Sequence, residues 1–262
     1  MSQGCSRREV LGTAGRLLSA GALGIPLRLG SAVPRWRPCP LSFADSPAAL
    51  RDLSTALKAR TSEPPDTAVA GSYPAPEVVP LIHSRSEWGA LPPKRAAQVL
   101  PHGPDHIVVH HTDSPNSADT SLAHAFELSR SIQRFHMFRR GWDDIGQQLT
   151  ITRGGHVLEG RNRSLPSIME RRLVVGAQTM HQNDHTLGIE NEGTYMTAPV
   201  APLLWTSLVK VCGWLCTVYE LDPQQAIVGH RDFMSTDCPG DVLYGRLPEL
   251  RRAVAQLIAG LR

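Results

Sequence analysis

The chain has 262 residues, of which 41% are hydrophobic and 19% charged, and its formal net charge is +3. This composition excludes a wholly disordered chain, and the length fits one domain with extensions. The arginine pairs are scattered and lack interleaved aromatic residues, so we expect no nucleic-acid partner. No run of 18 or more uninterrupted apolar residues occurs, and we therefore expect no transmembrane segment.

Residues 1–32 have the layout of an export signal. A basic start with the pair Arg7-Arg8 precedes a mildly apolar run over residues 17–29, and small residues follow up to Ala32. This order is typical of a signal peptide, and paired arginines before a hydrophobic residue resemble the twin-arginine type. We expect cleavage after Ala32 and an exported protein, periplasmic or extracellular. The alternative interpretation is an ordinary basic tail.

Residues 33–80 contain nine prolines. This density predicts a linker or a wrapping arm rather than a domain, with one short helical candidate over residues 48–60. The patterns become regular from about Ile82, so we place a single domain at residues 81–262.

Hydrophobic patterns over residues 81–262 predict alternating strands and helices. Strands are expected at 106–111, 149–152, 156–159, 186–192 and 226–230, and helices at 121–140, 203–221 and 247–261. The segments 149–152 and 156–159 are joined by Arg153-Gly154-Gly155 and should form a hairpin. Strands interleaved with helices indicate an α/β domain with a central mixed β-sheet flanked by helices.

Histidine and cysteine side chains stand where a rigid metal site would need them. His110 and His111 end one predicted strand, His230 ends another, and Cys238 follows eight residues later. Two imidazoles and one thiolate are typical ligands of zinc and leave a fourth position open. Adjacent strand residues point to opposite faces, so one of His110 and His111 can face a shared metal. The alternative is a set of hydrogen-bonded core histidines and an inert thiol.

Five motifs occur in an order that resembles a known family. They are Arg85-Ser86-Glu87-Trp88-Gly89-Ala90, Val108-Val109-His110-His111-Thr112, Gly141-Trp142-Asp143-Asp144-Ile145-Gly146, Leu187-Gly188-Ile189-Glu190, and Gly229-His230-Arg231-Asp232 with Thr236-Asp237-Cys238-Pro239-Gly240. Together they resemble the zinc-dependent N-acetylmuramoyl-L-alanine amidases, the family shared by phage amidases and peptidoglycan recognition proteins. The resemblance spans about residues 83–245. It implies a groove for peptidoglycan or muropeptides, and we expect a monomer.

The resemblance also implies roles for individual residues. It places Zn²⁺ on His110, His230 and Cys238, a set that non-catalytic members of the family lack in part. Thr236 falls where the family has a side chain that contacts the reacting carbonyl oxygen. The substrate-binding candidates are Gln147, Asn183 and Arg231, and His136, Trp142 and Asp144 match the supporting residues of the family.

The identity of the general base stays open at this point. The usual tyrosine of the family, which holds the attacking water, is Gln147 here, and an amide side chain is no base. Glu190 resembles the base of the anhydro-muropeptide branch, although that branch typically has aspartate where this chain has Cys238. The expected reaction is hydrolysis of the amide between N-acetylmuramic acid and L-alanine, and the alternative is a non-catalytic recognition module.

Overall fold

The computed structural model of the chain describes residues 79–261. The expected export signal, the Pro-rich arm and the short helix over residues 48–60 lie outside the described residues. They stay predictions from the sequence.

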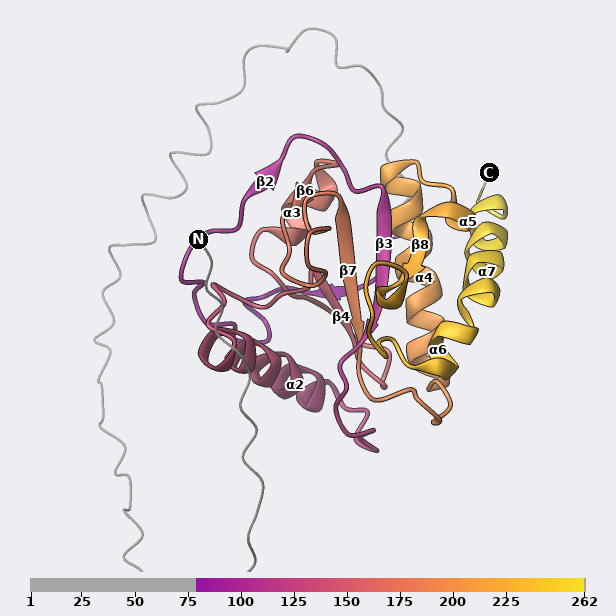
Figure 1. The fold of residues 1–262 in the computed structure, drawn as a ribbon. Coiled ribbons are helices and arrows are strands. Elements are labelled where there is room, and N and C mark those ends of the chain that lie inside the picture. Colours follow the sequence, from indigo (N-terminus) through magenta and orange to yellow (C-terminus); the bar gives the residue numbers. More distant parts are fainter. Residues whose placement is uncertain (1–78, 262) are drawn as a thin grey trace, which may run out of the picture. The chain divides into compact units, whose positions relative to one another are not determined.

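A mixed six-stranded sheet forms the centre of the domain (Figure 1). Its strand order is β1-β5-β4-β7-β3-β8. The strands are β1 (Ile82–His83), β3 (His106–His111), β4 (Leu149–Ile151), β5 (Val157–Glu159), β7 (Thr186–Asn191) and β8 (Ile227–Gly229). Strands β4 and β5 are antiparallel and the other neighbours are parallel. A separate antiparallel pair joins β2 (Val99–Leu100) to β6 (Leu173–Val174).

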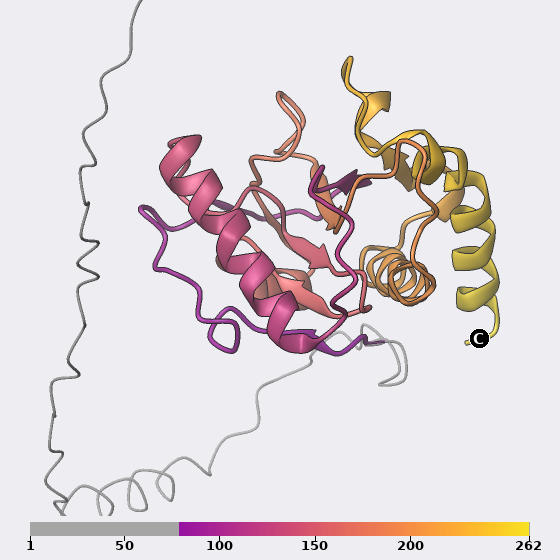
Figure 2. The same cartoon turned by 90° about the horizontal axis from the view of Figure 1, so that it is seen from below.

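Helices cover both faces of the sheet. In Figure 2, α2 (Leu122–Arg134) lies on one side of the strands, and α4 (Pro202–Tyr219) and α7 (Leu247–Ala259) lie on the other. The shorter helices are α3 (Ser164–Met169), α5 (Pro223–Ala226) and α6 (Asp241–Gly245). The expected mixed sheet with flanking helices is confirmed.

The main hydrophobic core lies between α4, α7 and one face of the sheet. Ile107 and Val109 of β3 point into it, and Leu204 and Leu208 of α4 meet them there. Among the described helices, α4 is long and apolar enough to cross a membrane, but half of it is buried in the domain. Burial in the core accounts for its apolar composition.

The opposite face of the sheet carries α2 at one end and is open at the other. Leu158 of β5 packs with Trp88 and with Ala125 of α2. The strand register places His110, Glu190, Thr150 and Leu158 in one row across the sheet. Directly paired residues share a face, so α2 covers the Leu158 end of this row and leaves the His110 end for a site.

The expected elements are found with small shifts at their ends. Ser121 caps α2 by accepting a hydrogen bond from the backbone N–H of His124 at 3.2 Å. The helical path continues as a π-helix over Phe135–Arg139 and stops near Gly141, whose φ is +76°. The predicted strand at 226–230 is shorter, because Ala226 ends α5 and His230 begins a 3₁₀ turn.

Candidate metal centre

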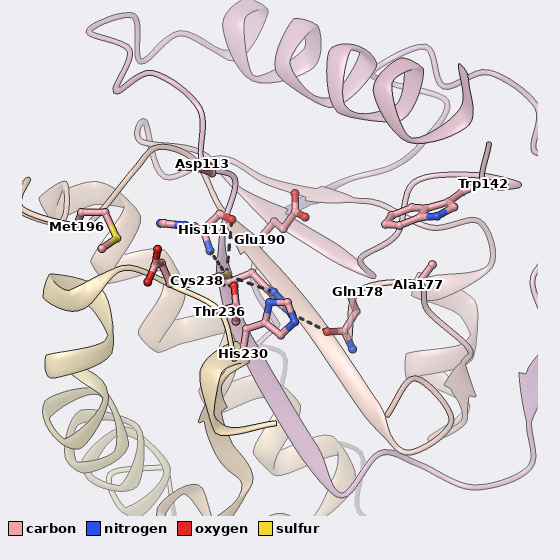
Figure 3. A pocket seen from close by; sticks show the side chains of 12 residues that line it. His111, Asp113, Trp142, Ala177, Gln178, Glu190, Met196, His230, Thr236 and Cys238 are labelled. Atoms are coloured by element: carbon pink, nitrogen blue, oxygen red, sulfur yellow. Dashed lines mark hydrogen bonds between the residues drawn. The ribbon is translucent and has the colours of Figure 1, made fainter. Parts of the chain in front are cut away.

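A pocket of about 400 Å³ opens at the carboxyl ends of β3, β7 and β8. The strands contribute His110, His111 and Glu190 to its wall. The loop after β8 contributes a second set: His230, Thr236, Asp237 and Cys238. In Figure 3, Met196 and Trp142 lie at opposite ends of the pocket, with Glu190 between them.

Three side chains in this pocket come together as a candidate metal centre. One ligand atom from each of His110, His230 and Cys238 lies within 4.8 Å of the other two. The Sγ of Cys238 is 3.6 Å from Nδ1 of His110, and the imidazole rings of His110 and His230 are 4.4 Å apart. His111 is not in this group: its Nδ1 accepts a hydrogen bond from the backbone N–H of Tyr195 at 3.4 Å.

The sheet topology explains why residues 120 positions apart in the sequence meet. Strands β3 and β8 are parallel neighbours, and Val109 pairs with Gly229. The next residue of each strand is therefore His110 and His230, at the same edge of the sheet. The loop then returns, and the Sγ of Cys238 accepts a hydrogen bond from the backbone N–H of His111 at 3.4 Å.

A neighbouring amide fixes the orientation of His110. Its Nε2 lies 2.6 Å from Oε1 of Gln178. If Nε2–H donates to this carbonyl oxygen, the lone pair of the neutral ring is on Nδ1, the atom that faces Cys238. In that arrangement Gln178 would hold His110 in the tautomer that can bind a metal through Nδ1.

Burial keeps the three candidate ligands uncharged in the metal-free protein. It lowers the pKa of His110 to about 3, with a further contribution from the charge of His230. It also lowers the pKa of His230, with help from His111. For Cys238, burial raises the thiol pKa to about 12. The imidazoles are therefore in the metal-binding state, and the thiol would release its proton on binding a metal.

Glu190 and Thr236 lie beside this group. Glu190 is paired in register with His110 across β3 and β7. Burial raises the pKa of its carboxyl to about 8, and no other cause contributes among the described residues. The Oγ1 of Thr236 accepts a hydrogen bond from the backbone N–H of Cys238 at 3.3 Å, and its side chain also lines the pocket.

The three expected substrate-binding residues have contacts outside the pocket wall. Gln147 is buried and donates from Nε2 to Thr150 Oγ1 at 2.9 Å, while its Oε1 has no partner among the described residues. Asn183 accepts at Oδ1 from the backbone N–H groups of Gln178 (2.8 Å) and Thr179 (3.2 Å).

Arg231 stabilises the loop that carries Thr236 and Cys238. Its guanidinium donates to Asp241 Oδ1 at 2.7 Å and to the backbone carbonyl of Asp237. It also lies over the ring of Tyr244, 4.8 Å from its centre. The structure therefore gives Asn183 and Arg231 contacts that hold loops of the site in place.

Two of the expected supporting residues, His136 and Asp144, are buried and hydrogen-bonded. His136 accepts at Nδ1 from the backbone N–H of Gly146 at 3.1 Å and lies 4.6 Å from the Trp142 ring. Asp144 accepts hydrogen bonds from Arg85, Gln133 and Asn162. Trp142 also lines the pocket, which the sequence did not indicate.

Gln178 is the residue that sequence analysis missed at this site. It lies in the irregular segment between β6 and β7, where no periodicity marks it. One signal was present in the motif Leu187-Gly188-Ile189-Glu190. A Cβ on Gly188 would lie 2.7 Å from Cγ of Gln178, and a glycine inside a strand often marks such a close approach.

Residues 100–241 match the N-acetylmuramoyl-L-alanine amidase family. The chain belongs to this family. An N-acetylmuramoyl-L-alanine amidase of Sus scrofa is 35% identical over 170 residues, which cover 64% of this chain and 27% of that protein. Peptidoglycan recognition protein 1 of Bos indicus is 32% identical, over 62% of this chain and 80% of that protein.

A solved structure shows the same fold. The Drosophila peptidoglycan recognition protein LB, as a point mutant in complex with tracheal cytotoxin, aligns with a TM-score of 0.56 and 27% identity. The alignment covers 63% of this chain and 92% of that one. The chain spans about a quarter of the length of the mammalian amidases that it matches.

Proposed function

We propose that this chain is a zinc-dependent hydrolase that cleaves the amide between N-acetylmuramic acid and L-alanine in peptidoglycan. The observation that carries this proposal is the convergence of His110, His230 and Cys238 beside Glu190 in one open pocket. Membership of the N-acetylmuramoyl-L-alanine amidase family supports the reaction.

The donor set fits Zn²⁺. Two imidazoles and one thiolate are common zinc ligands, and three protein ligands leave a position open for substrate or water. The carboxamide of Gln178 supplies the hydrogen bond that metal-bound histidines usually make. When bound, zinc would act as a Lewis acid on the amide carbonyl and lower the pKa of the attacking water.

The surrounding side chains of the protein would carry out the proton transfers. Glu190 would accept the proton of the attacking water and pass it to the leaving amine, because its carboxyl faces the pocket and its raised pKa lies near the working range of a base. The hydroxyl of Thr236 would donate to the oxygen of the reacting carbonyl. Gln147 cannot accept a proton at all.

Peptidoglycan fragments are the proposed partners. The related Drosophila protein was solved with tracheal cytotoxin. In the pocket of this chain, Trp142 and Met196 lie at opposite ends (Figure 3). The export signal expected at residues 1–32 agrees with a substrate outside the cytoplasm. We also propose that the protein is a monomer.

Metal analysis combined with digestion of purified cell wall tests the proposal. Stoichiometric zinc together with newly exposed amino termini of L-alanine is the expected result. If zinc-loaded protein binds cell wall without cleaving it, the protein is a recognition module and not an enzyme. Zinc with neither cleavage nor binding would refute both.

A further inference from the structure

A second cluster of metal-binding side chains lies at the other end of β3 and β7. Asp105, His106 and His185 each offer one ligand atom within 4.8 Å of the other two. The Oδ1 of Asp105 lies 2.6 Å from Nδ1 of His106 and 2.8 Å from Nδ1 of His185. Both histidines therefore direct the same ring atom toward one carboxylate.

Two paired strands hold this cluster in place. The backbone N–H of Asp105 donates to the carbonyl of His185 at 2.9 Å, and His106 pairs with Thr186 in the parallel ladder. The cluster therefore lies where the β3–β7 pair begins (Figure 1), and most residues of that pair are buried. Side chains on such a platform need little reordering to bind a metal.

Both ring nitrogens of His185 have polar partners. Its Nε2 lies 2.6 Å from Oε1 of Gln182, while its Nδ1 faces Asp105. A neutral imidazole donates from one nitrogen only. If Nε2–H donates to Gln182, the lone pair of the neutral ring is on Nδ1, the atom that faces Asp105 and that a metal ion would bind.

The cluster is separate from the candidate metal centre. His106 and His110 are four residues apart on the same face of β3, which is about 13 Å along a strand. None of Asp105, His106 and His185 lines the pocket. The two sites are linked through Phe233, whose ring packs edge-on against His106 (5.6 Å) and His185 (6.2 Å).

We propose that Asp105, His106 and His185 form a second binding site, for a divalent transition-metal ion such as Zn²⁺. Two imidazoles and one carboxylate are a donor set that zinc accepts, and the exposed carboxylate leaves coordination positions for water. Gln182 would orient His185 as Gln178 orients His110. Because Phe233 lies between His230 and Cys238 in sequence, a metal here would also steady the loop that carries those ligands.

Zinc titration of the full chain, followed by equilibrium dialysis, tests this site. The wild-type chain should bind two zinc ions, and Asp105→Asn and His185→Ala should each bind one. Cys238→Ala should retain the second site and bind one, and Cys238→Ala combined with His185→Ala should bind none. Gln182→Ala should weaken the second zinc about 10-fold or more.

The matched control is His181→Ala, which removes an exposed histidine from the same segment and should leave two zinc ions bound. Circular dichroism of each variant shows that it is folded, and Asp105→Asn preserves the size of the side chain where His185→Ala does not. One zinc in the wild-type chain that Asp105→Asn and His185→Ala leave unchanged would overturn the proposal. Two zinc ions in both variants would overturn it as well.

Discussion

The exchange of Glu190 for glutamine tests the chemistry of the site most directly. Glutamine has nearly the same shape, so the β3–β7 register and the packing around it should persist, but an amide cannot accept a proton. A positioned general base contributes about 10²- to 10⁴-fold to the rate. We therefore expect kcat for amide cleavage to fall by that factor, or by about 3 to 5 kcal/mol in activation free energy, with zinc content unchanged.

Two other substitutions serve as controls for Glu190→Gln. Glu192 lies two residues after Glu190, just past the end of β7, and its carboxylate contacts His124 Nε2 at 2.7 Å and the backbone N–H of Arg153 at 2.7 Å. Glu192→Gln should therefore destabilise the fold and lower kcat less than Glu190→Gln does. Gln147→Ala should also reduce kcat much less than Glu190→Gln. The assay is release of L-alanine amino termini from cell wall by zinc-loaded variants. Cleavage by Glu190→Gln at nearly the wild-type rate would refute the assignment of the base.

Three further predictions concern the metal, its support and export. His230→Ala and Cys238→Ala should each lose the zinc of the candidate metal centre and the activity, whereas His111→Ala should keep most of that zinc, as measured by metal analysis of dialysed protein. Gln178→Ala should weaken zinc binding at that centre by about 10- to 100-fold in competition with a chelator, because His110 loses its orienting partner; unchanged affinity would contradict this role. Replacement of the Arg7-Arg8 pair by lysines should retain the precursor inside the cell, and normal export in a fractionation assay would argue against a twin-arginine signal.

The regular helices and strands could be predicted from local sequence patterns, whereas the approach of His110 to His230 could not. The run His106–His111 is β-branched and bounded by turn residues, and Ser121 and Gly141 mark where the α2 path begins and stops. The pairing of β3 with β8 has no local signal, so spacing alone could not show that His110 and His230 meet. The family resemblance supplied that relation.

Short and irregular elements were not predicted. Strands β1, β2 and β6 have two residues each, which is too short for any alternation to appear. The π-helix after α2 (Phe135–Arg139) was not predicted either, because five residues are too few for its longer turn to leave a periodic pattern. Gln178 acts on His110 from 68 positions away, and such a contact depends on the finished fold. Gln182 contacts His185 three residues later, but it lies in an irregular segment where no pattern marks it.

The stability of the domain should also report one buried histidine outside the proposed ligands. Burial lowers the pKa of His136 from 6.5 to about 4, with smaller contributions from Arg140 and Arg161. The unfolded chain then binds a proton at a higher pH than the folded one. The contribution of neutral His136 to the free energy of unfolding is therefore complete above about pH 6.5 and is lost as the pH falls toward 4. At about 1.4 kcal/mol per unit of pKa, the loss amounts to about 3 kcal/mol.

His136→Gln keeps an acceptor for the backbone N–H of Gly146 but does not titrate. Urea unfolding between pH 7 and 4 should therefore show a shallower loss of stability for the variant than for the wild type, in metal-free protein, and parallel curves would show that His136 is not held neutral by its surroundings.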